Sequence, residues 1–288
     1  SAASDVYKRQ VDILSIDYQS NNCAKLLEKS LRETGFAVIN NHPISHRLIQ
    51  DVYFEWKSFF SAKLKHNYIF DIKEQDGFFP YLTENAKGSK SKDLKEFFHY
   101  YPWGQFPDSM SNKTKTLYDQ LVNLGSDILS SIEENFPKTV KENLHSSMKN
   151  MIHNSKNHLF RILHYPPVPK DSTLGSIRAH QHEDINLITL LVAGSEPGLE
   201  VLGNDLKWYQ VDSNENNIVV NSGDMLKLAT NNYYPSTTHR VVNPSKNENV
   251  SRYSMPLFIH PNSDAMLDKY TRADQFLNDR LKEIGLKE

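Results

Sequence analysis

The sequence predicts a mainly β protein, a sandwich or jelly roll, with flanking helices. From His158 onward, short apolar runs bounded by turn residues follow one another closely. Strands spaced in this way are typical of sandwiches and jelly rolls and argue against a parallel sheet. The runs are HLFRILHY, INLITLLV, LEVL, WYQV, NIVV, MLKLA, HRVV and RYSMPLFIH.

The first half of the chain predicts two strand-and-helix pairs followed by an irregular segment. Residues 11–16 alternate apolar and polar side chains, and a helix with an apolar stripe should follow and stop at Gly35. FAVINNH then predicts a second strand, and ISHRLIQDVYFEWKSFFSAKLKH a second helix. Between Tyr68 and Pro107 the periodicity lapses, and the many Gly, Pro and aromatic residues there predict an irregular connection with short elements.

Two more helical segments flank the predicted strands. One runs from about Asn112 to Met151 and should break near Pro137. The other is the C-terminal stretch ADQFLNDRLKEIGLKE, with an inward face of Phe276, Leu277, Leu281 and Ile284. The opening SAASDVYKRQ has neither period, so we expect residues 1–10 to be a disordered tail or an assembly scar.

Composition limits the classes of partner. The 288 residues include 33 basic and 35 acidic ones, a balance that gives no electrostatic footprint for nucleic acid or an anionic membrane and favours a small-molecule substrate. Cys23 is the only cysteine, so any metal must take histidine and carboxylate ligands. No run approaches the roughly 20 apolar residues that span a bilayer. We expect a soluble, cytoplasmic protein, with a monomer favoured.

The stretch HQHED, residues 180–184, holds the strongest candidate metal ligands. Residues two apart on a strand share a face, so His182 and Asp184 should converge while Glu183 points away. The apolar run that follows predicts a strand buried on both faces, where a carboxylate is costly unless it is paired or coordinated. With His239, they make the two-histidine, one-carboxylate set of non-haem iron(II) oxygenases, which leaves three positions open for a chelating co-substrate and oxygen.

Other interpretations of HQHED fit the sequence less well. A histidine satisfied by the backbone beside a turn aspartate is the default for an isolated pair, but it leaves the matching His239 unexplained. A metallo-β-lactamase-like HxHxDH motif would add His180 as a ligand and needs histidine where this chain has Ile185. A cupin-like site has its glutamate several residues after HxH, whereas Glu183 follows at once.

A second constellation lies on the predicted strand RYSMPLFIHP. Arg252 and Ser254 stand two apart and therefore share a face. A guanidinium can bind a carboxylate through two parallel hydrogen bonds, and a serine hydroxyl can add a third. In isolation the pair would be an ordinary exposed arginine and a strand serine. Downstream of a candidate iron site it predicts a carboxylate pocket.

With these residues in place, the chain resembles the isopenicillin N synthase-like family of iron(II) and 2-oxoglutarate-dependent oxygenases. The resemblance covers nearly everything after the first ten residues. It implies a double-stranded β-helix, or jelly roll, within one oxygenase domain. We expect this single domain to span residues 11–288. It should comprise an N-terminal helical and mixed part at 11–155, a jelly-roll core at 156–262 and a C-terminal helix at 263–288. The motifs that carry the resemblance are LLEKSLRETGFAVINNHPI, GFFPY, KGSKSKDLKEFFHYYPWGQFP, RILHYPPVP, HEDINLITLL, NSGDMLKLATNNYYPSTTHRVVNP and RYSMPLFIHP.

The same resemblance implies the roles of the site residues. Iron(II) would be bound by His182, Asp184 and His239, and the distal carboxylate of 2-oxoglutarate by Arg252 and Ser254. Enzymes of this kind oxidise a substrate, most often by hydroxylation, while 2-oxoglutarate and O2 yield succinate and CO2. We therefore expect an iron(II)- and 2-oxoglutarate-dependent dioxygenase that acts on a small molecule.

Further residues are candidates by their positions. Tyr165 would support the co-substrate carboxylate, and His180 falls outside the ligand pattern and should lie beside the site. Arg161 or Arg178 is a candidate for a second carboxylate, on an amino-acid-like or organic-acid substrate. The candidate substrate-lining residues are Phe78, Phe79, Tyr81, Arg161, His180, Tyr233 and Tyr234.

Two alternative functions stay open on the sequence alone. Isopenicillin N synthase and the aminocyclopropane carboxylate oxidases keep an RxS pair, use it for a carboxylate of the substrate and work without 2-oxoglutarate. A non-catalytic jelly-roll binding protein with a vestigial site belongs to a different class. The presence of all three triad residues and of the carboxylate anchor disfavours it.

Overall fold

Two β-sheets form the centre of the protein. Its structure, a computed structural model, describes residues 12–84, 92–170, 175–192, 194–212 and 214–283. The larger sheet consists of β1 (Ser15–Asp17), β2 (Phe36–Asn40), β3 (Gly77–Phe79), β4 (Glu96–Tyr100), β5 (Leu159–Tyr165), β7 (Ile188–Val192), β10 (Ile218–Ser222) and β12 (Arg252–Ile259). The smaller sheet consists of β6 (Ala179–His182), β8 (Leu199–Leu202), β9 (Trp208–Gln210) and β11 (His239–Val241).

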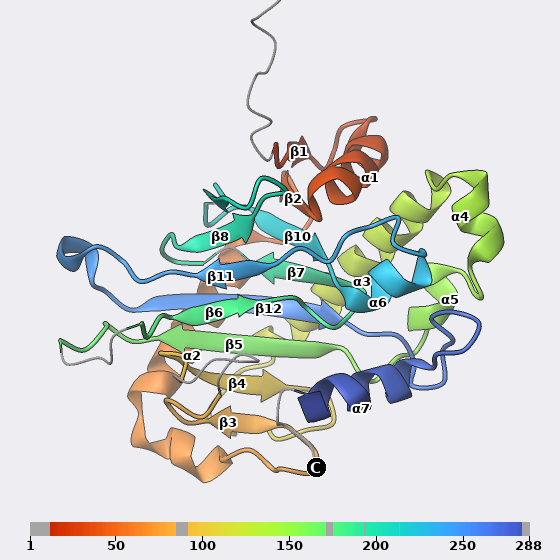
Figure 1. The fold of residues 1–288 in the computed structure, drawn as a ribbon. Coiled ribbons are helices and arrows are strands. Elements are labelled where there is room, and N and C mark those ends of the chain that lie inside the picture. The colour runs from red at the N-terminus through yellow and green to blue at the C-terminus, as the bar shows by residue number, and fades with distance from the viewer. Residues whose placement is uncertain (1–11, 85–91, 171–174, 193, 213, 284–288) are drawn as a thin grey trace, which may run out of the picture.

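The strand order is that of a jelly roll. The larger sheet runs β1-β2-β10-β7-β12-β5-β4-β3 and the smaller one β6-β11-β8-β9. Within the described residues every neighbouring pair of these strands is antiparallel except β1 with β2. From β5 to β12 the chain passes repeatedly from one sheet to the other (Figure 1), which confirms the predicted double-stranded β-helix.

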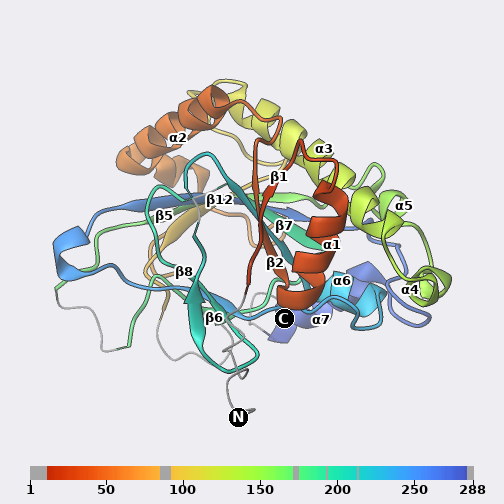
Figure 2. The ribbon, with the colours of Figure 1, turned by 90° about the horizontal axis from the view of Figure 1, so that it is seen from above.

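Helices cover one face of the larger sheet. Figure 2 shows α2 and α3 on the side of that sheet opposite to β6 and β8, and α3 contacts β7 and β12 directly. A large apolar cluster fills the space between these helices and the sheet, with Trp56 at its centre and wholly buried. The helices are α1 (Cys23–Thr34), α2 (His46–Ser61), η1 (Lys63–Tyr68), α3 (Lys113–Glu134), α4 (Lys138–Asn143), α5 (Met148–Ile152), α6 (Asp224–Ala229), η2 (Lys246–Glu248) and α7 (Ala273–Glu283).

The space between the two sheets has two separate apolar clusters. One joins β2 and β10 to β8 through side chains such as Phe36 and Val201. The other joins β3, β4 and β5 to β6 and β11 through side chains such as Phe97 and Tyr165. His239 touches the first cluster through Phe36, at 5.5 Å between ring centroids, and the Arg252 guanidinium lies over the Tyr165 ring of the second. The polar candidate site therefore lies between two apolar ends.

Several predicted elements are confirmed. The helix that follows residues 11–16 ends at Gly35, whose φ of 73° and N–H bond to the Leu31 carbonyl close the last turn. The long helical stretch breaks at Pro137, and the irregular segment contributes β3 and β4. The N-terminal tail and Ile284 lie outside the described residues.

Two strand predictions were wrong. MLKLA forms the helix α6, because the buried side chains Met225, Leu226 and Ala229 follow a helical spacing that a five-residue run does not distinguish from a strand. The HxD motif and the apolar run after it do not share one strand either. β6 ends at His182 in the smaller sheet, and β7 begins at Ile188 in the larger one.

The described part of the chain contains no helix that is both long and apolar enough to cross a membrane.

Gly35 is a position where both backbone conformation and space require glycine. Its φ is positive, and a Cβ there would meet the Thr237 hydroxyl, which donates to the Thr34 carbonyl and fixes the segment before His239. We expect Gly35→Ala to lower the free energy of unfolding by about 2–4 kcal/mol, through left-handed strain plus overpacking.

Gly175 provides the matched control, because its φ is 88° and a Cβ would meet nothing within 4 Å. Gly175→Ala should cost only about 1 kcal/mol in urea unfolding. Equal losses in the two variants would contradict the close contact at Gly35.

Candidate active site

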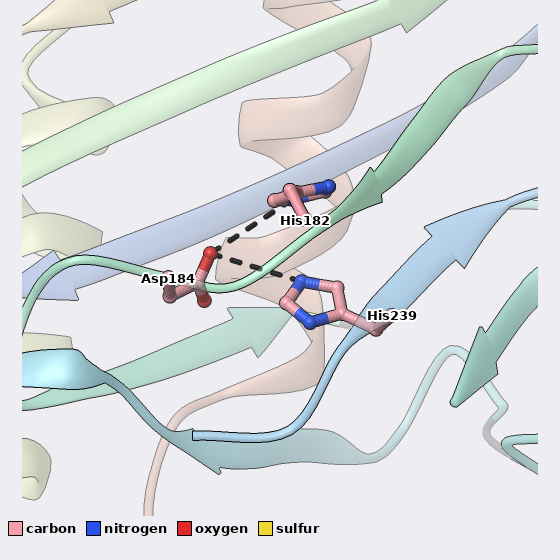
Figure 3. Close-up of side chains that lie close together, drawn as sticks. All are labelled: His182, Asp184 and His239. Atoms are coloured by element: carbon pink, nitrogen blue, oxygen red, sulfur yellow. Dashed lines mark ion pairs between the residues drawn. The ribbon is translucent and has the colours of Figure 1, made fainter. Parts of the chain in front are cut away.

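Three potential metal ligands converge between the sheets (Figure 3). His182 is the last residue of β6, His239 is the first of β11, and the two are paired in register. Asp184 lies two residues beyond β6. Its Oδ1 is 3.9 Å from Nε2 of His182 and 3.7 Å from Nε2 of His239, and one ligand atom from each residue lies within 4.8 Å of the others.

Each histidine is held with Nε2 free for a ligand. Nδ1 of His182 lies 2.7 Å from the His180 carbonyl, and Nδ1 of His239 lies 3.0 Å from the Thr237 carbonyl. Because a carbonyl can only accept, Nδ1 must carry the proton in both rings, and Nε2 presents its lone pair. Burial, and then the neighbouring His239, lowers the pKa of His182 to about 4, so this imidazole is neutral near pH 7.

The two carboxylate oxygens of Asp184 have different surroundings. Oδ2 accepts hydrogen bonds from Thr189 Oγ1 at 2.6 Å and from Asn221 Nδ2 at 2.8 Å. Oδ1 is left facing the two histidines. Burial alone would raise the pKa of Asp184, but the positive charge that His239 and His182 carry when they are protonated, together with these two hydrogen bonds, outweighs it, and the pKa lies below its ordinary value.

The backbone beside Asp184 is fixed by the start of α6. The Asp224 N–H donates to the Asp184 carbonyl at 2.8 Å, and the Met225 N–H donates to carbonyls of the same connection. A Cβ at Gly223 would collide with the Asn186 carbonyl, so only glycine permits this close approach. The helix that the sequence failed to predict therefore sets the position of the carboxylate ligand.

This arrangement fits iron(II). Two neutral imidazoles and one carboxylate are the donors of the facial triad, which leaves adjacent positions open. The side chains of His239 and Asp184 are 10% and 6% exposed, whereas that of His182 is 40% exposed. The site is therefore enclosed on the sides of His239 and Asp184 and open on the side of His182.

A buried guanidinium lies at the start of β12 in the larger sheet. Arg252 and Ser254 are 3% and 2% exposed and pair in register with Tyr165 and Leu163 of β5. Arg252 donates from Nη1 to Ser254 Oγ at 3.2 Å and from Nε to the Glu196 carbonyl at 2.9 Å, and its guanidinium lies 5.3 Å from the centre of the Tyr165 ring. Neither hydrogen-bond partner carries a negative charge, which suits a site for an anion.

The predicted substrate-lining residues fall into three groups. His180 and Arg161 join a polar network described below. Tyr81 is half-buried, and Phe79 stacks on Phe97 in the inter-sheet cluster that contains Tyr165. The other three pack elsewhere: Phe78 against Phe59 and Phe60, Tyr234 against Phe136, and Tyr233 with its hydroxyl donating to Glu28. Their proposed contact with substrate stays a prediction.

Sequence reasoning missed a buried chain of charges next to the triad. Asp93 accepts from the His180 backbone N–H at 3.1 Å and lies 2.5 Å from its Nδ1. Lys95 bridges Asp93 and Glu84 at 2.8 and 2.7 Å, and Glu84 also faces Arg161 at 3.4 Å. Despite burial, these carboxylates raise the pKa of Lys95. The alternation of Asp93 and Lys95 ahead of β4 was the available signal.

A jelly roll in which two histidines and an aspartate converge has the ligand set of a non-haem iron oxygenase. Comparison with known proteins agrees. Residues 156–261 match the 2OG-Fe(II) oxygenase superfamily, and residues 11–121 match the family described as non-haem dioxygenase in morphine synthesis N-terminal.

Individual relatives match over most of the chain. A 2-oxoglutarate-dependent dioxygenase of Didymella fabae is 28% identical over 281 residues, 88% of this chain and 83% of its own. A crystal structure described as an oxygenase, from Shewanella oneidensis, is 43% identical with a TM-score of 0.86 and covers 95% of this chain and 98% of its own.

A crystal structure assigned to the 2OG-Fe(II) oxygenase family, from Caulobacter crescentus, is 32% identical with a TM-score of 0.78, and covers 94% of this chain and 99% of its own. The chain belongs to the 2OG-Fe(II) oxygenase superfamily, as its sequence motifs indicated. It is an iron(II)- and 2-oxoglutarate-dependent dioxygenase.

The two hydrogen bonds to Asp184 Oδ2 give a test of how the ligand is positioned. Thr189→Val keeps the side-chain shape and removes one donor. We expect it to raise the apparent dissociation constant for iron(II) by about tenfold or more, as is typical for loss of a partner that orients a ligand. Anaerobic titration with iron(II) measures this.

Thr116→Val is the matched control, because that exposed hydroxyl donates only to the Asn112 carbonyl on α3. An unchanged dissociation constant in Thr189→Val would show that the hydrogen bond does not position the ligand.

Proposed function

We propose that His182, Asp184 and His239 hold one iron(II) and that Arg252 and Ser254 hold the distal carboxylate of 2-oxoglutarate. The convergence of three ligand atoms, each oriented by a second contact of its own side chain, is the observation that carries the assignment. Bound there, iron(II) and 2-oxoglutarate would supply oxidation by O2, with one oxygen atom entering succinate, the other entering the substrate as a hydroxyl group, and CO2 released.

The chain's own residues prepare the site for this reaction. The Nδ1–H bonds of the two histidines keep both rings in the ligand tautomer. Thr189 and Asn221 occupy one oxygen of Asp184, so that only Oδ1 remains for a metal. The two apolar clusters border the site and limit the access of water from those two sides, while the side of His182 stays open.

We propose that substrate enters on the exposed side of His182, beside the charged chain of Asp93, Lys95, Glu84 and Arg161. Arg161 already faces Glu84, so a carboxylate on the substrate would have to compete with that residue. Acidic and basic groups alternate here, which suits a small molecule with hydrogen-bonding groups of both kinds. Phe79 offers an aromatic wall nearby.

Of the two alternative functions, the non-catalytic binding protein gains no support from the site. A binding protein with a vestigial centre has no need of three ligands that are each oriented by an outer hydrogen bond. An oxidase that works without 2-oxoglutarate would place a carboxylate of its substrate at Arg252. The single-domain division, a cytoplasmic location and a monomeric state stay predictions.

The triad is tested by succinate formation under air, with iron(II) and 2-oxoglutarate and no other substrate. We expect His182→Ala and Asp184→Ala to lower this slow turnover by about 100-fold or more, because loss of a ligand should exceed the 10- to 100-fold effect of losing an outer partner. His153→Ala, at an exposed position, is the control and should match the wild type. Equal turnover in all four proteins would show that His182 and Asp184 do not bind the catalytic iron.

A further inference from the structure

Arg178 is a second buried arginine close to Arg252. It directly precedes β6 and is 1% exposed, among the largest fully buried side chains of the described residues. Its Nη2 donates to the Val250 carbonyl, and its Nε is buried without a hydrogen-bond partner. Buried guanidinium groups are rarely left without an anion, because desolvation of the charge is costly unless it is paired and hydrogen-bonded.

The surroundings of Arg178 add positive charge where a negative one is expected. Burial, and next the charge of Arg252, lowers the pKa of Arg178, and Tyr165 and Glu196 are the groups that oppose this. Glu196 is half-exposed and its backbone carbonyl is already bonded to Arg252. Within the described part of the chain, no carboxylate forms an ion pair with Arg178 or Arg252. Two buried guanidinium groups thus influence each other, and neither has an acid to neutralise it.

The backbone of the loop after β7 approaches Arg252 closely. A Cβ at Gly194 would lie 2.6 Å from Nη2 of Arg252, so the loop after β7 leaves room only for the guanidinium. Arg252 spends Nε on the Glu196 carbonyl and Nη1 on Ser254, and the Tyr165 ring lies against its guanidinium. The hydrogen bonds of Arg252 to neutral partners leave the combined charge of the two arginines uncompensated.

We propose that Arg178 is a specificity-determining residue for the co-substrate, a second cation that acts with Arg252 and Ser254 on the distal carboxylate of 2-oxoglutarate. This inference rests on the proposed role of Arg252 and Ser254. It moves Arg178 from the substrate side, where the sequence made it a candidate, to the co-substrate side. An enzyme with two cations at this end selects 2-oxo acids with a second carboxylate over those without one.

The test compares the affinity of two 2-oxo acids. 2-Oxoglutarate and 2-oxopentanoate have chains of the same length, and only the first has the distal carboxylate. Their dissociation constants are measured without oxygen on the iron(II)-loaded protein, from the rise in melting temperature with ligand concentration. We expect Arg178→Met to raise the dissociation constant of 2-oxoglutarate by at least about tenfold, which is the effect of losing a hydrogen bond to a charged group. The dissociation constant of 2-oxopentanoate should stay unchanged.

Two control variants separate the possible failures. Arg252→Met should also lower the affinity for 2-oxoglutarate selectively, and if it does not, the assignment of Arg252 to the co-substrate carboxylate is overturned. If Arg252→Met lowers this affinity and Arg178→Met does not, only the role of Arg178 is overturned. Arg272→Met removes an exposed arginine that pairs with Asp274 on the surface and should change neither affinity.

A purely structural role for Arg178 would give a different pattern. Equal weakening of both 2-oxo acids, or a lower melting temperature with both affinities intact, would overturn the proposal. If Arg178→Met does not fold, Arg178→Lys provides the test. Lysine keeps the positive charge but lacks the planar guanidinium, so the affinity for 2-oxoglutarate should fall by about threefold or more while that for 2-oxopentanoate stays the same. Unchanged 2-oxoglutarate affinity in Arg178→Lys would overturn the proposal as well.

Discussion

The site depends on keeping one carboxylate oxygen free in an interior where carboxylates are costly. Asp184 is buried, and two neutral donors on β7 and β10, Thr189 and Asn221, bind only one of its oxygens. The first turn of α6 holds the backbone through the Asp224 N–H, and Gly223 permits the approach. Asn221 lies 37 residues beyond Asp184 in the sequence, and the pairing of β10 with β7 in the larger sheet, which sets Asn221 opposite Thr189, brings both donors to one side chain.

The jelly roll separates the polar and apolar demands of such a site. Its two inner clusters close the ends of the space between the sheets, and the ligands lie between them. Each polar group left in that space is oriented by a neighbour: His182 and His239 by carbonyls, and Arg252 by Ser254 and a carbonyl. Charge is the exception. The guanidinium groups of Arg252 and Arg178 stay without an acid, which is the reason for proposing that they bind an anion.

The closely spaced short strands predicted a sandwich or jelly roll, and the alternation of His182 and Asp184 predicted that these two ligands converge. The double-stranded β-helix and the inclusion of His239 in one iron site came from the resemblance to the oxygenase family. What the sequence missed depends on contacts made across the fold. MLKLA, which precedes the distal histidine region, was too short to reveal whether it is a strand or the helix that pins Asp184. Asp93 and Lys95 look like surface residues in an irregular segment, and only the pairing of β4 with β5 buries them beside His180.

The proposed function requires that His182, Asp184 and His239 hold iron(II) while Arg252 holds the distal carboxylate of the same bound 2-oxoglutarate. A crystal structure grown without oxygen in the presence of iron(II) and 2-oxoglutarate is the decisive measurement. We expect an anomalous iron signal within coordination distance of Nε2 of His182, Oδ1 of Asp184 and Nε2 of His239, with the distal carboxylate of 2-oxoglutarate at Arg252. Iron bound elsewhere, or a carboxylate turned away from Arg252, would contradict it.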